Sequence, residues 1–480
     1  MRGIPPTGSS GLSGWAHTLN HWLDDPRILQ GLTIAIFALA VGFRIALAML
    51  NLEANDNHMA VSQVMAFENR IPDETELHQS YHPKLFHGTA ALIWRILPDP
   101  SLENATRAAQ LLNAVAGIVT ILAALALLRR LNLSPRTLVL AFGFIALNPR
   151  LIAINVQAAN DSFVILFGAL TLFFGYRFFE HWRWTHFLGM LASAVLATLS
   201  KSSGLVLFLG VAGVFGLALA GGRRLAPCVP RRAAAYGVLF VAAYLVLAGW
   251  LGPYWGYYRE YGTPLISNHE TPPFPYFFKK TYYGRPGVTS IAQTLLTFRL
   301  IDLIRHPISS QQKDTYPIHR TSLWSHVYGS THFSRFDSHP QTWRTRSRIV
   351  HWWGRAILIL ALFPTALLVS GMVRWAVRLG RDWIKATRRR ESLSEALLLL
   401  AFAGIVAAIC FYALRQRSFT SMKAIYIFPA MLGALAIFAV EYDRLISRLR
   451  PSLRLAAESA IAALLVLYLG DIAILTYQLR

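Results

Sequence analysis

Charged residues and cysteines are both scarce in this sequence. Only 15% of the 480 residues are charged, whereas 54% are hydrophobic. A typical soluble domain carries about a quarter charged residues, so this deficit argues against a soluble protein and indicates apolar surface that faces lipid. The two cysteines, Cys228 and Cys410, form no CxxC pair, so neither a disulfide framework nor a cysteine-rich metal site is expected.

The hydrophobic residues are gathered in blocks that are long enough to cross a bilayer. A helix needs roughly 20 mostly apolar residues to span the hydrocarbon core. We therefore predict an all-α integral membrane protein with about eleven transmembrane helices. The predicted spans lie at about 31–51, 106–128, 137–155, 160–177, 186–201, 203–221, 234–252, 354–373, 394–414, 424–441 and 456–476.

Acidic residues are fewer than basic residues: the chain has 24 of the former and 46 of the latter, and its formal net charge is +22. In a membrane protein this excess reports topology, because short cytoplasmic loops retain arginine and lysine. The arginine-rich short loops lie at 129–136, 177–183, 223–232, 374–390 and 444–454. We assign these loops to the cytoplasm, and we attribute the basic excess to the bilayer and to phosphate-bearing ligands rather than to nucleic acid.

This topology leaves two long loops on the opposite face of the membrane. Residues 1–30 become a cytoplasmic tail, and 31–480 a single transmembrane domain. The first outer loop, 52–105, contains two short amphipathic helices at about 56–68 and 84–97, which suit the membrane interface. The second, 253–353, is rich in tyrosine, histidine, proline and basic residues. Its aromatic rings favour the interface and also stack on sugars.

An acidic residue follows the first span directly, in the sequence Asn55-Asp56-Asn57-His58. A carboxylate at the membrane surface can accept the proton of an attacking hydroxyl, so Asp56 is our candidate general base. The alternative is an ordinary solvated loop charge.

The same outer loop contains Ser80-Tyr81-His82-Pro83-Lys84. Lys84 can bind a phosphate as a compact charge, or it can be an interfacial lysine whose stem lies along apolar surface. The histidines of this loop match no strong zinc spacing, so we expect packing or interface roles for them. A divalent metal is compatible with the sequence but is not required by it.

Further polar residues come to the same face at the ends of later spans. Asn160-Asp161 opens a span, as a second acid of the site or as a simple helix cap. Lys201 lies between two closely spaced spans, where an ionisable group is a functional candidate, with interfacial snorkelling as the alternative. Arg417 and Lys423, followed by Tyr426, lie on the outer side against the topological bias, so a structural explanation is weaker for them.

Taken in order, these motifs resemble those of the GT-C superfamily of polyprenyl-phosphate-sugar-dependent glycosyltransferases. They are most similar to the branch of protein O-mannosyltransferases and bacterial aminoarabinose transferases of lipid A. The resemblance is best over 31–221. The matching elements are the loop acid (Asn55-Asp56), the opening of the second interfacial helix (His82-Pro83-Lys84), the acid of the fourth span (Asn160-Asp161), the lysine turn (Ser200-Lys201) and the basic-Tyr-x-x-Pro helix (Lys423 to Pro429).

The resemblance implies an inverting transfer of a sugar from a polyprenyl-phosphate donor to an acceptor hydroxyl of a lipid, a glycan or a protein. Asp56 would be the base. The donor phosphate would be bound by Lys84, Lys201, Arg417 and Lys423. The sugar and the acceptor would contact Asn55, His58, His82, Asn160, Asp161 and Tyr426. Many members have a second acid beside the loop acid, but here Asn55 and Asn57 flank it, so a metal held by paired acids is not expected.

Two other functional classes fit parts of the sequence. A transporter or flippase of an anionic lipid or solute would use the same cations, although we find no duplication between the two halves of the chain, which transporters often show. A non-catalytic membrane scaffold would be indifferent to replacement of Asp56, Lys84 or Lys201 by alanine. The bacterial inner membrane, with the site on its periplasmic face, is the location that we expect.

Overall fold

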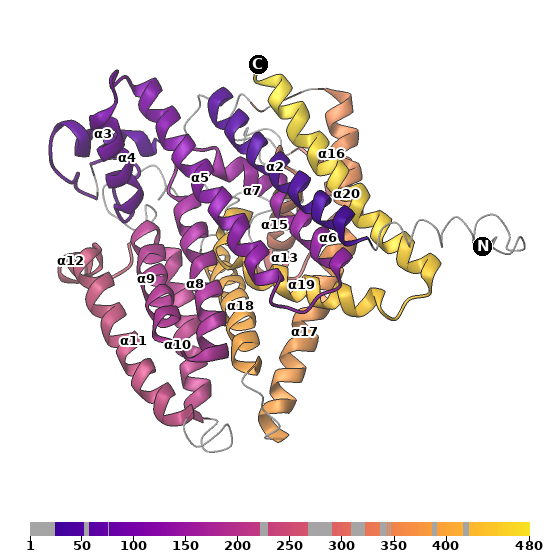
Figure 1. Ribbon diagram of the computed structural model, residues 1–480. Coiled ribbons are helices and arrows are strands. Elements are labelled where there is room, and N and C mark those ends of the chain that lie inside the picture. The colour runs from indigo at the N-terminus through magenta and orange to yellow at the C-terminus, as the bar shows by residue number, and fades with distance from the viewer. Residues whose placement is uncertain are drawn as a thin grey trace, which may run out of the picture.

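The computed structural model describes residues 25–51, 57–74, 76–220, 229–266, 290–308, 322–336, 343, 345, 347–385, 391–415 and 422–480. Within these ranges the regular structure is entirely helical (Figure 1). The long helices are α2 (Pro26–Leu50), α5 (Leu102–Leu128), α8 (Asp161–His181), α9 (Trp184–Ser200), α10 (Leu205–Ala220), α11 (Val229–Leu251), α17 (Leu362–Lys385), α18 (Glu391–Arg415), α19 (Met431–Ile446) and α20 (Pro451–Gln478).

Shorter helices connect and cover the long ones. They are α3 (His58–Phe67), α4 (Leu85–Ile96), α6 (Pro135–Ala146), α7 (Pro149–Asn155), η1 (Ser202–Gly204), α12 (Tyr254–Tyr261), α13 (Ile291–Leu295), α14 (Leu300–Arg305), α15 (Leu323–His332), α16 (Arg348–Leu360), η7 (Ala424–Tyr426) and η8 (Phe428–Ala430). The two short helices that the sequence predicts in the first outer loop correspond to α3 and α4. The second of them begins at Leu85, just after the His82-Pro83 element.

The described residues contain nine helices that are long and apolar enough to span a membrane, or ten if a bent pair counts as one span. The bent pair is α6 and α7, which meet at 47°. Pro149 causes the break, because it disfavours a helical conformation at Asn148. Asn148 instead starts α7, its Oδ1 accepting a hydrogen bond of 2.9 Å from Leu151 N. The predicted span at 186–201 is the 17-residue helix α9, which is shorter than a full crossing.

Helix α8 lies at the centre of the bundle and packs against α5, α9 and α18. Close approach depends on small residues, as is usual between membrane helices. A Cβ atom at Gly168 would lie 2.2 Å from the backbone oxygen of Pro429, so α8 and η8 touch through the glycine. The same glycine-dependent contact brings the segment before α19 to the helix that starts at Asp161.

One end of the bundle is covered by the elements of the two long loops. Helix α4 contacts α5 and α9, and α12 follows α11 at the same end (Figure 1). Helix α15, from the second long loop, contacts both α7 and η7. Its His326 Nδ1 lies 2.8 Å from Met422 O, and Ser330 Oγ accepts a 3.2 Å bond from Ala424 N. Both contacts hold the segment that leads to Tyr426.

Candidate functional site

A lysine and an aspartate form a short ion pair where α8 begins and α9 ends. Lys201 Nζ lies 2.6 Å from Asp161 Oδ1, and their side chains are only 14% and 11% exposed. The two helices form an antiparallel hairpin, so the first residue of α8 and the residue after α9 come to the same end. Asp161 also lies in the first turn of α8, where the helix dipole favours a negative charge. This pairing disfavours the snorkelling interpretation of Lys201.

Asn160 holds the N-cap position of α8, but its side chain does not make the cap hydrogen bond. Its Nδ2 donates instead to the backbone oxygen of Ser200, at 3.1 Å. Asn160 thus occupies the cap position without capping the helix through its side chain: its side chain binds the end of α9, and that of Asp161 binds Lys201. Both interactions fix the lysine turn against the start of α8.

The segment that joins α7 to α8, residues 156–160, is buried although it is not helical. Unpaired backbone groups are costly at membrane depth, and here amide side chains from neighbouring helices pair them. Asn51 Nδ2 and Gln110 Nε2 donate to Val156 O at 3.0 and 3.1 Å. Asn113 Nδ2 donates to Gln157 O and Ala159 O at 2.6 and 2.8 Å. Asp161 therefore follows a segment that is held at several points.

The turn η7 brings Tyr426 to the same place. The Lys201 ammonium lies 5.4 Å from the centroid of the Tyr426 ring, within the range of a cation–π contact. Tyr412, on α18, packs edge-on against that ring. Lys423 directly precedes η7 and is half-buried. Residues far apart in sequence, at 161, 201 and 426, thus meet as the resemblance implies.

Three histidines of the first long loop form a cluster beside these residues, in which His58 and His87 are buried and His82 is half-buried. The ring of His58 stacks between His82 and His87, with centroids 5.8 and 5.2 Å away, and its Nδ1 lies 3.0 Å from His87 Nε2. Burial, together with the charges of Lys201 and His78, lowers the pKa of His58 to about 3. Burial and the nearby cations also lower the pKa of His82 well below its usual value. The cluster is therefore neutral at pH 7. Lys201 is close enough for its positive charge to lower the pKa of His58 and His82.

Lys84 lies directly before α4, and its ammonium donates to the backbone oxygens of Ser80 and His82, the latter at 2.9 Å. Burial lowers its pKa to about 8, and the charge of Glu74 partly opposes that shift. Two of the three ammonium protons are thus engaged by the loop itself. The charge of Lys84 is held close enough to His82 and His87 to lower the pKa of both.

Three residues of the sequence hypothesis, Asn55, Asp56 and Arg417, lie outside the described residues, so their predicted roles stay predictions. Within the described ranges no three histidine, cysteine, aspartate or glutamate side chains converge on a site that could hold a metal ion. The direct nitrogen-to-nitrogen contact of His58 and His87 leaves no room for an ion between them.

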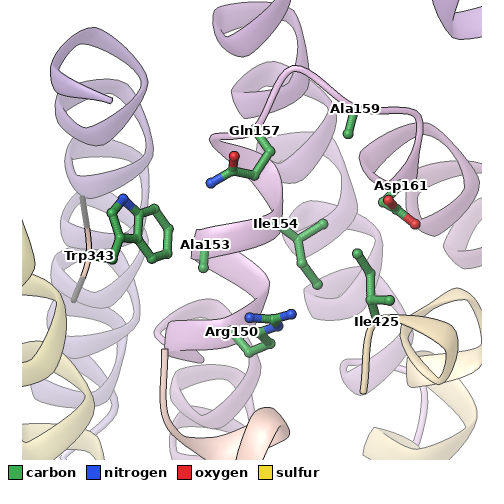
Figure 2. Close-up of a pocket in the computed structure, with 8 residues that line it drawn as sticks. All are labelled: Arg150, Ala153, Ile154, Gln157, Ala159, Asp161, Trp343 and Ile425. Carbon is green, nitrogen blue, oxygen red and sulfur yellow. The ribbon is translucent and has the colours of Figure 1, made fainter. Parts of the chain in front are cut away.

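A cavity opens beside Asp161 (Figure 2). Its lining residues are Arg150, Ala153, Ile154, Gln157, Ala159, Asp161, Trp343 and Ile425. The sequence hypothesis missed Arg150, Gln157 and Trp343. Arg150 carried a detectable signal, because it is an arginine within an otherwise apolar stretch. Gln157 and Trp343 carried none, because only the fold brings them together.

Residues 88–250 match the family model of dolichyl-phosphate-mannose-protein mannosyltransferase. This match supports membership of the GT-C superfamily. The matched range contains Asn160, Asp161 and Lys201. The described chain has the all-helical, membrane-spanning architecture expected of a GT-C enzyme, and its nine or ten apolar spans make it an integral membrane protein.

Two solved structures are similar over most of this chain. ArnT from Cupriavidus metallidurans bound to undecaprenyl phosphate is 15% identical, with a TM-score of 0.38; the match covers 88% of this chain and 81% of ArnT. The oligosaccharyltransferase of Archaeoglobus fulgidus, tethered with an acceptor peptide, is also 15% identical, with a TM-score of 0.47; it covers 93% of this chain and 55% of the other. No curated protein matches the sequence.

Proposed function

We propose that this GT-C protein is an inverting glycosyltransferase that moves a sugar from a polyprenyl-phosphate donor to an acceptor hydroxyl on the non-cytoplasmic face of the membrane. The observation that carries the proposal is the convergence of Lys201, Asp161 and Tyr426 at the end of the bundle that the two long loops cover. The family match over residues 88–250 supports the same class of reaction. The loop charge bias supports a site on the non-cytoplasmic face, and the Ala- and Arg-rich spans favour a bacterial inner membrane, in which that face is periplasmic.

Departure of the phosphate needs little help from an acid, but it needs cations that stabilise the developing negative charge. The acceptor oxygen attacks the anomeric carbon, the bond from that carbon to the phosphate oxygen breaks, and polyprenyl phosphate leaves with the electron pair. The product is a phosphomonoester whose second pKa is about 6, so it leaves without protonation at pH 7. The growing negative charge needs preorganised cations. Lys201 and Lys84 supply two of them, and Lys423 and Arg417 are the further candidates.

Asp56 is the proposed base, which takes the proton of the acceptor hydroxyl as the oxygen attacks. The neutral histidine cluster begins two residues later, at His58, and leaves the proton with the carboxylate because its own pKa is too low to compete for it. His82 and Asn160 would line the space for sugar and acceptor. The acceptor is a lipid, glycan or protein hydroxyl.

The Asp56→Asn variant tests this function. We expect transfer to fall by at least a hundredfold, since general base catalysis contributes about 10²–10⁴-fold, while donor affinity stays within twofold. The assay follows transfer from undecaprenyl-phosphate sugars by mass spectrometry and measures donor binding on the same preparations. Parallel loss of binding and transfer would argue against a base. Transport of the lipid without any transfer by the unmodified protein would favour a flippase instead.

A further inference from the structure

The short helix α12 is mostly exposed, yet it buries two tyrosines. It begins the second long loop, at the end of α11 and on the side of the first long loop (Figure 1). Tyr254 and Tyr257 are 8% and 7% exposed, whereas Trp255 and Tyr258 of the same helix are 57% and 53% exposed. Because residues three apart in a helix lie on one face, both buried rings point to the same side.

The hydroxyls of the two buried tyrosines bind segments of the candidate site that are far apart in sequence. Tyr257 Oη donates to Tyr81 O at 3.0 Å, and Tyr254 Oη donates to Thr198 O at 2.7 Å. Thr198 O is one of the last carbonyl oxygens of α9, which have no amide partner within their own helix. Tyr254 therefore caps the helix that ends directly before Lys201.

Tyr257 binds the same stretch of backbone that holds Lys84. The Lys84 ammonium donates to the backbone oxygens of Ser80 and His82. The oxygen between these two is Tyr81 O, which accepts the bond from Tyr257. Three successive carbonyl groups are thus fixed, two by the lysine and one by α12. Loss of the Tyr257 hydroxyl would free the middle carbonyl and loosen the loop that positions the lysine.

The two ends of α12 fix how the helix lies between these segments. A Cβ atom at Gly252 would lie 2.5 Å from Ala248 O, so a glycine is needed where the chain turns out of α11. Tyr261, on the same face as the buried tyrosines, donates to Glu74 of the first long loop. Gly262 then ends the helix at a φ of 71°, a conformation that glycine adopts without strain. The helix is therefore attached along its whole length.

We propose that α12 holds the Lys84 loop and the Lys201 turn at a fixed separation, so that both ammonium groups can bind one donor phosphate. Tyr254 and Tyr257 are then positioning residues, because they act through backbone oxygens and not on the substrate. Both lysines already lie near one residue, His82, whose pKa their charges lower. The inference rests on the proposed function, because it needs a phosphate that both lysines bind. It goes beyond that function by assigning their relative placement to a helix outside the phosphate site.

This arrangement predicts how the effects of two substitutions combine. Loss of either hydroxyl detaches one segment from α12, which already releases the two lysines from their fixed separation. The apparent dissociation constant of the phosphate ligand rises as the fraction of molecules with both lysines in place falls. Loss of the second hydroxyl then adds little. Two tyrosines that only stiffened their own segments would have independent effects, and those effects would multiply.

The test uses Tyr254→Phe, Tyr257→Phe and the double variant, because phenylalanine keeps the ring and removes only the hydroxyl. Affinities of the purified full chain for undecaprenyl phosphate and for undecaprenol are measured by native mass spectrometry. Each single variant should bind undecaprenyl phosphate about three- to tenfold more weakly, the effect of one lost hydrogen bond. The double variant should be weaker than the weaker single variant by less than about twofold. Affinity for undecaprenol, which has no phosphate, should change by less than about twofold.

Tyr258→Phe is the matched control, since it removes the same group from a side chain of α12 that is 53% exposed, and it should change neither affinity. If the double variant does not fold, the single variants decide, because each must lose affinity for the phosphate-bearing lipid alone. Unchanged affinities in both single variants, or losses that multiply in the double variant, would overturn the inference. So would an equal loss of undecaprenol binding, which would assign the hydroxyls to general stability. An unmodified protein that binds no undecaprenyl phosphate would overturn the proposed function itself, before any substitution is made.

Discussion

The Lys201–Asp161 ion pair allows a quantitative test of how deeply the site is shielded from water. The chain contains a second pair with the same separation, Arg70 and Glu76, at 2.6 Å. The side chains of that pair are 45% and 31% exposed, against 14% and 11% for Lys201 and Asp161. At equal distance the Coulomb attraction scales inversely with the effective dielectric constant, which is about 20 near a protein and about 80 in bulk water. The gross attraction in the shielded pair is thus up to about four times larger.

Much of that gain offsets the cost of removing both charges from water. We expect a net coupling energy of about 1–3 kcal/mol for Lys201–Asp161, and a smaller coupling energy for the exposed pair, which water screens. The measurement is a double-mutant cycle with Lys201→Met, Asp161→Asn and the double variant. The free energy of unfolding is followed by helical circular dichroism in mixed micelles of mild detergent and dodecyl sulfate. The same cycle with Arg70→Met and Glu76→Gln is the control.

The control has the better geometry, because Arg70 binds both carboxylate oxygens of Glu76 at 2.6 Å each. If geometry decides the energy, the exposed pair will show the larger coupling. If exclusion of water decides it, the Lys201 pair will. Equal or reversed coupling energies would refute the claim that this end of the bundle is shielded. A shielded Lys201 is also what the proposed stabilisation of a leaving phosphate requires.

Two further predictions follow from the structure. Because the pKa of Lys84 is lowered to about 8, the affinity for bare undecaprenyl phosphate should fall severalfold between pH 7 and 9.5, and Lys84→Arg should flatten that titration. From pH 7 upward the lipid phosphate is mostly dianionic, so its own titration does not contribute to this fall in affinity. The unfolded lysine holds its proton up to about pH 10.5, whereas the folded lysine loses it near pH 8. Lys84 should therefore make the free energy of unfolding rise over pH 8–10.5, and Lys84→Arg should lack that rise. Separately, Gly168→Ala should cost about 1–3 kcal/mol or more, because the new Cβ meets Pro429 O, while Gly216→Ala, with nothing within 4 Å, should be neutral or slightly stabilising in thermal unfolding.

The apolar periodicity of the sequence predicts most of the bundle. Nine of the eleven predicted spans correspond to helices long enough to cross the membrane. The two exceptions have local causes: Pro149 divides one span into a bent pair, and the helix that ends at Ser200 has only 17 residues. A hydropathy average over about 20 residues does not resolve either feature, because the segments before Asn148 and after Arg150 are apolar. The short helices α3 and α4 were visible in the sequence through their amphipathic pattern and the proline before the second.

The candidate site was predictable only where motifs mark it. The motif order placed Asn160-Asp161 and Lys201 on one face, but not in contact, because the ion pair depends on how α8 and α9 align as a hairpin. The shift in the pKa of Lys84 depends on its burial in the folded protein, which the sequence does not show. Gln157 and Trp343 were invisible, since a glutamine in a short loop and one tryptophan among 13 carry no pattern.

Polar residues within the apolar helices explain why the site can be rigid without regular structure. Gln110 and Asn113 lie in a membrane-spanning helix, α5, where amides are costly unless they are hydrogen-bonded. Both donate to the backbone oxygens of the segment just before Asp161, as Asn51 does from the end of α2. Irregular backbone is tolerated at membrane depth only where protein pairs it or where it lines a cavity, and residues 156–160 satisfy both conditions. The amides of Asn51, Gln110 and Asn113 therefore hold the segment that precedes Asp161. Gln157 and Ala159 of that segment line the cavity beside Asp161.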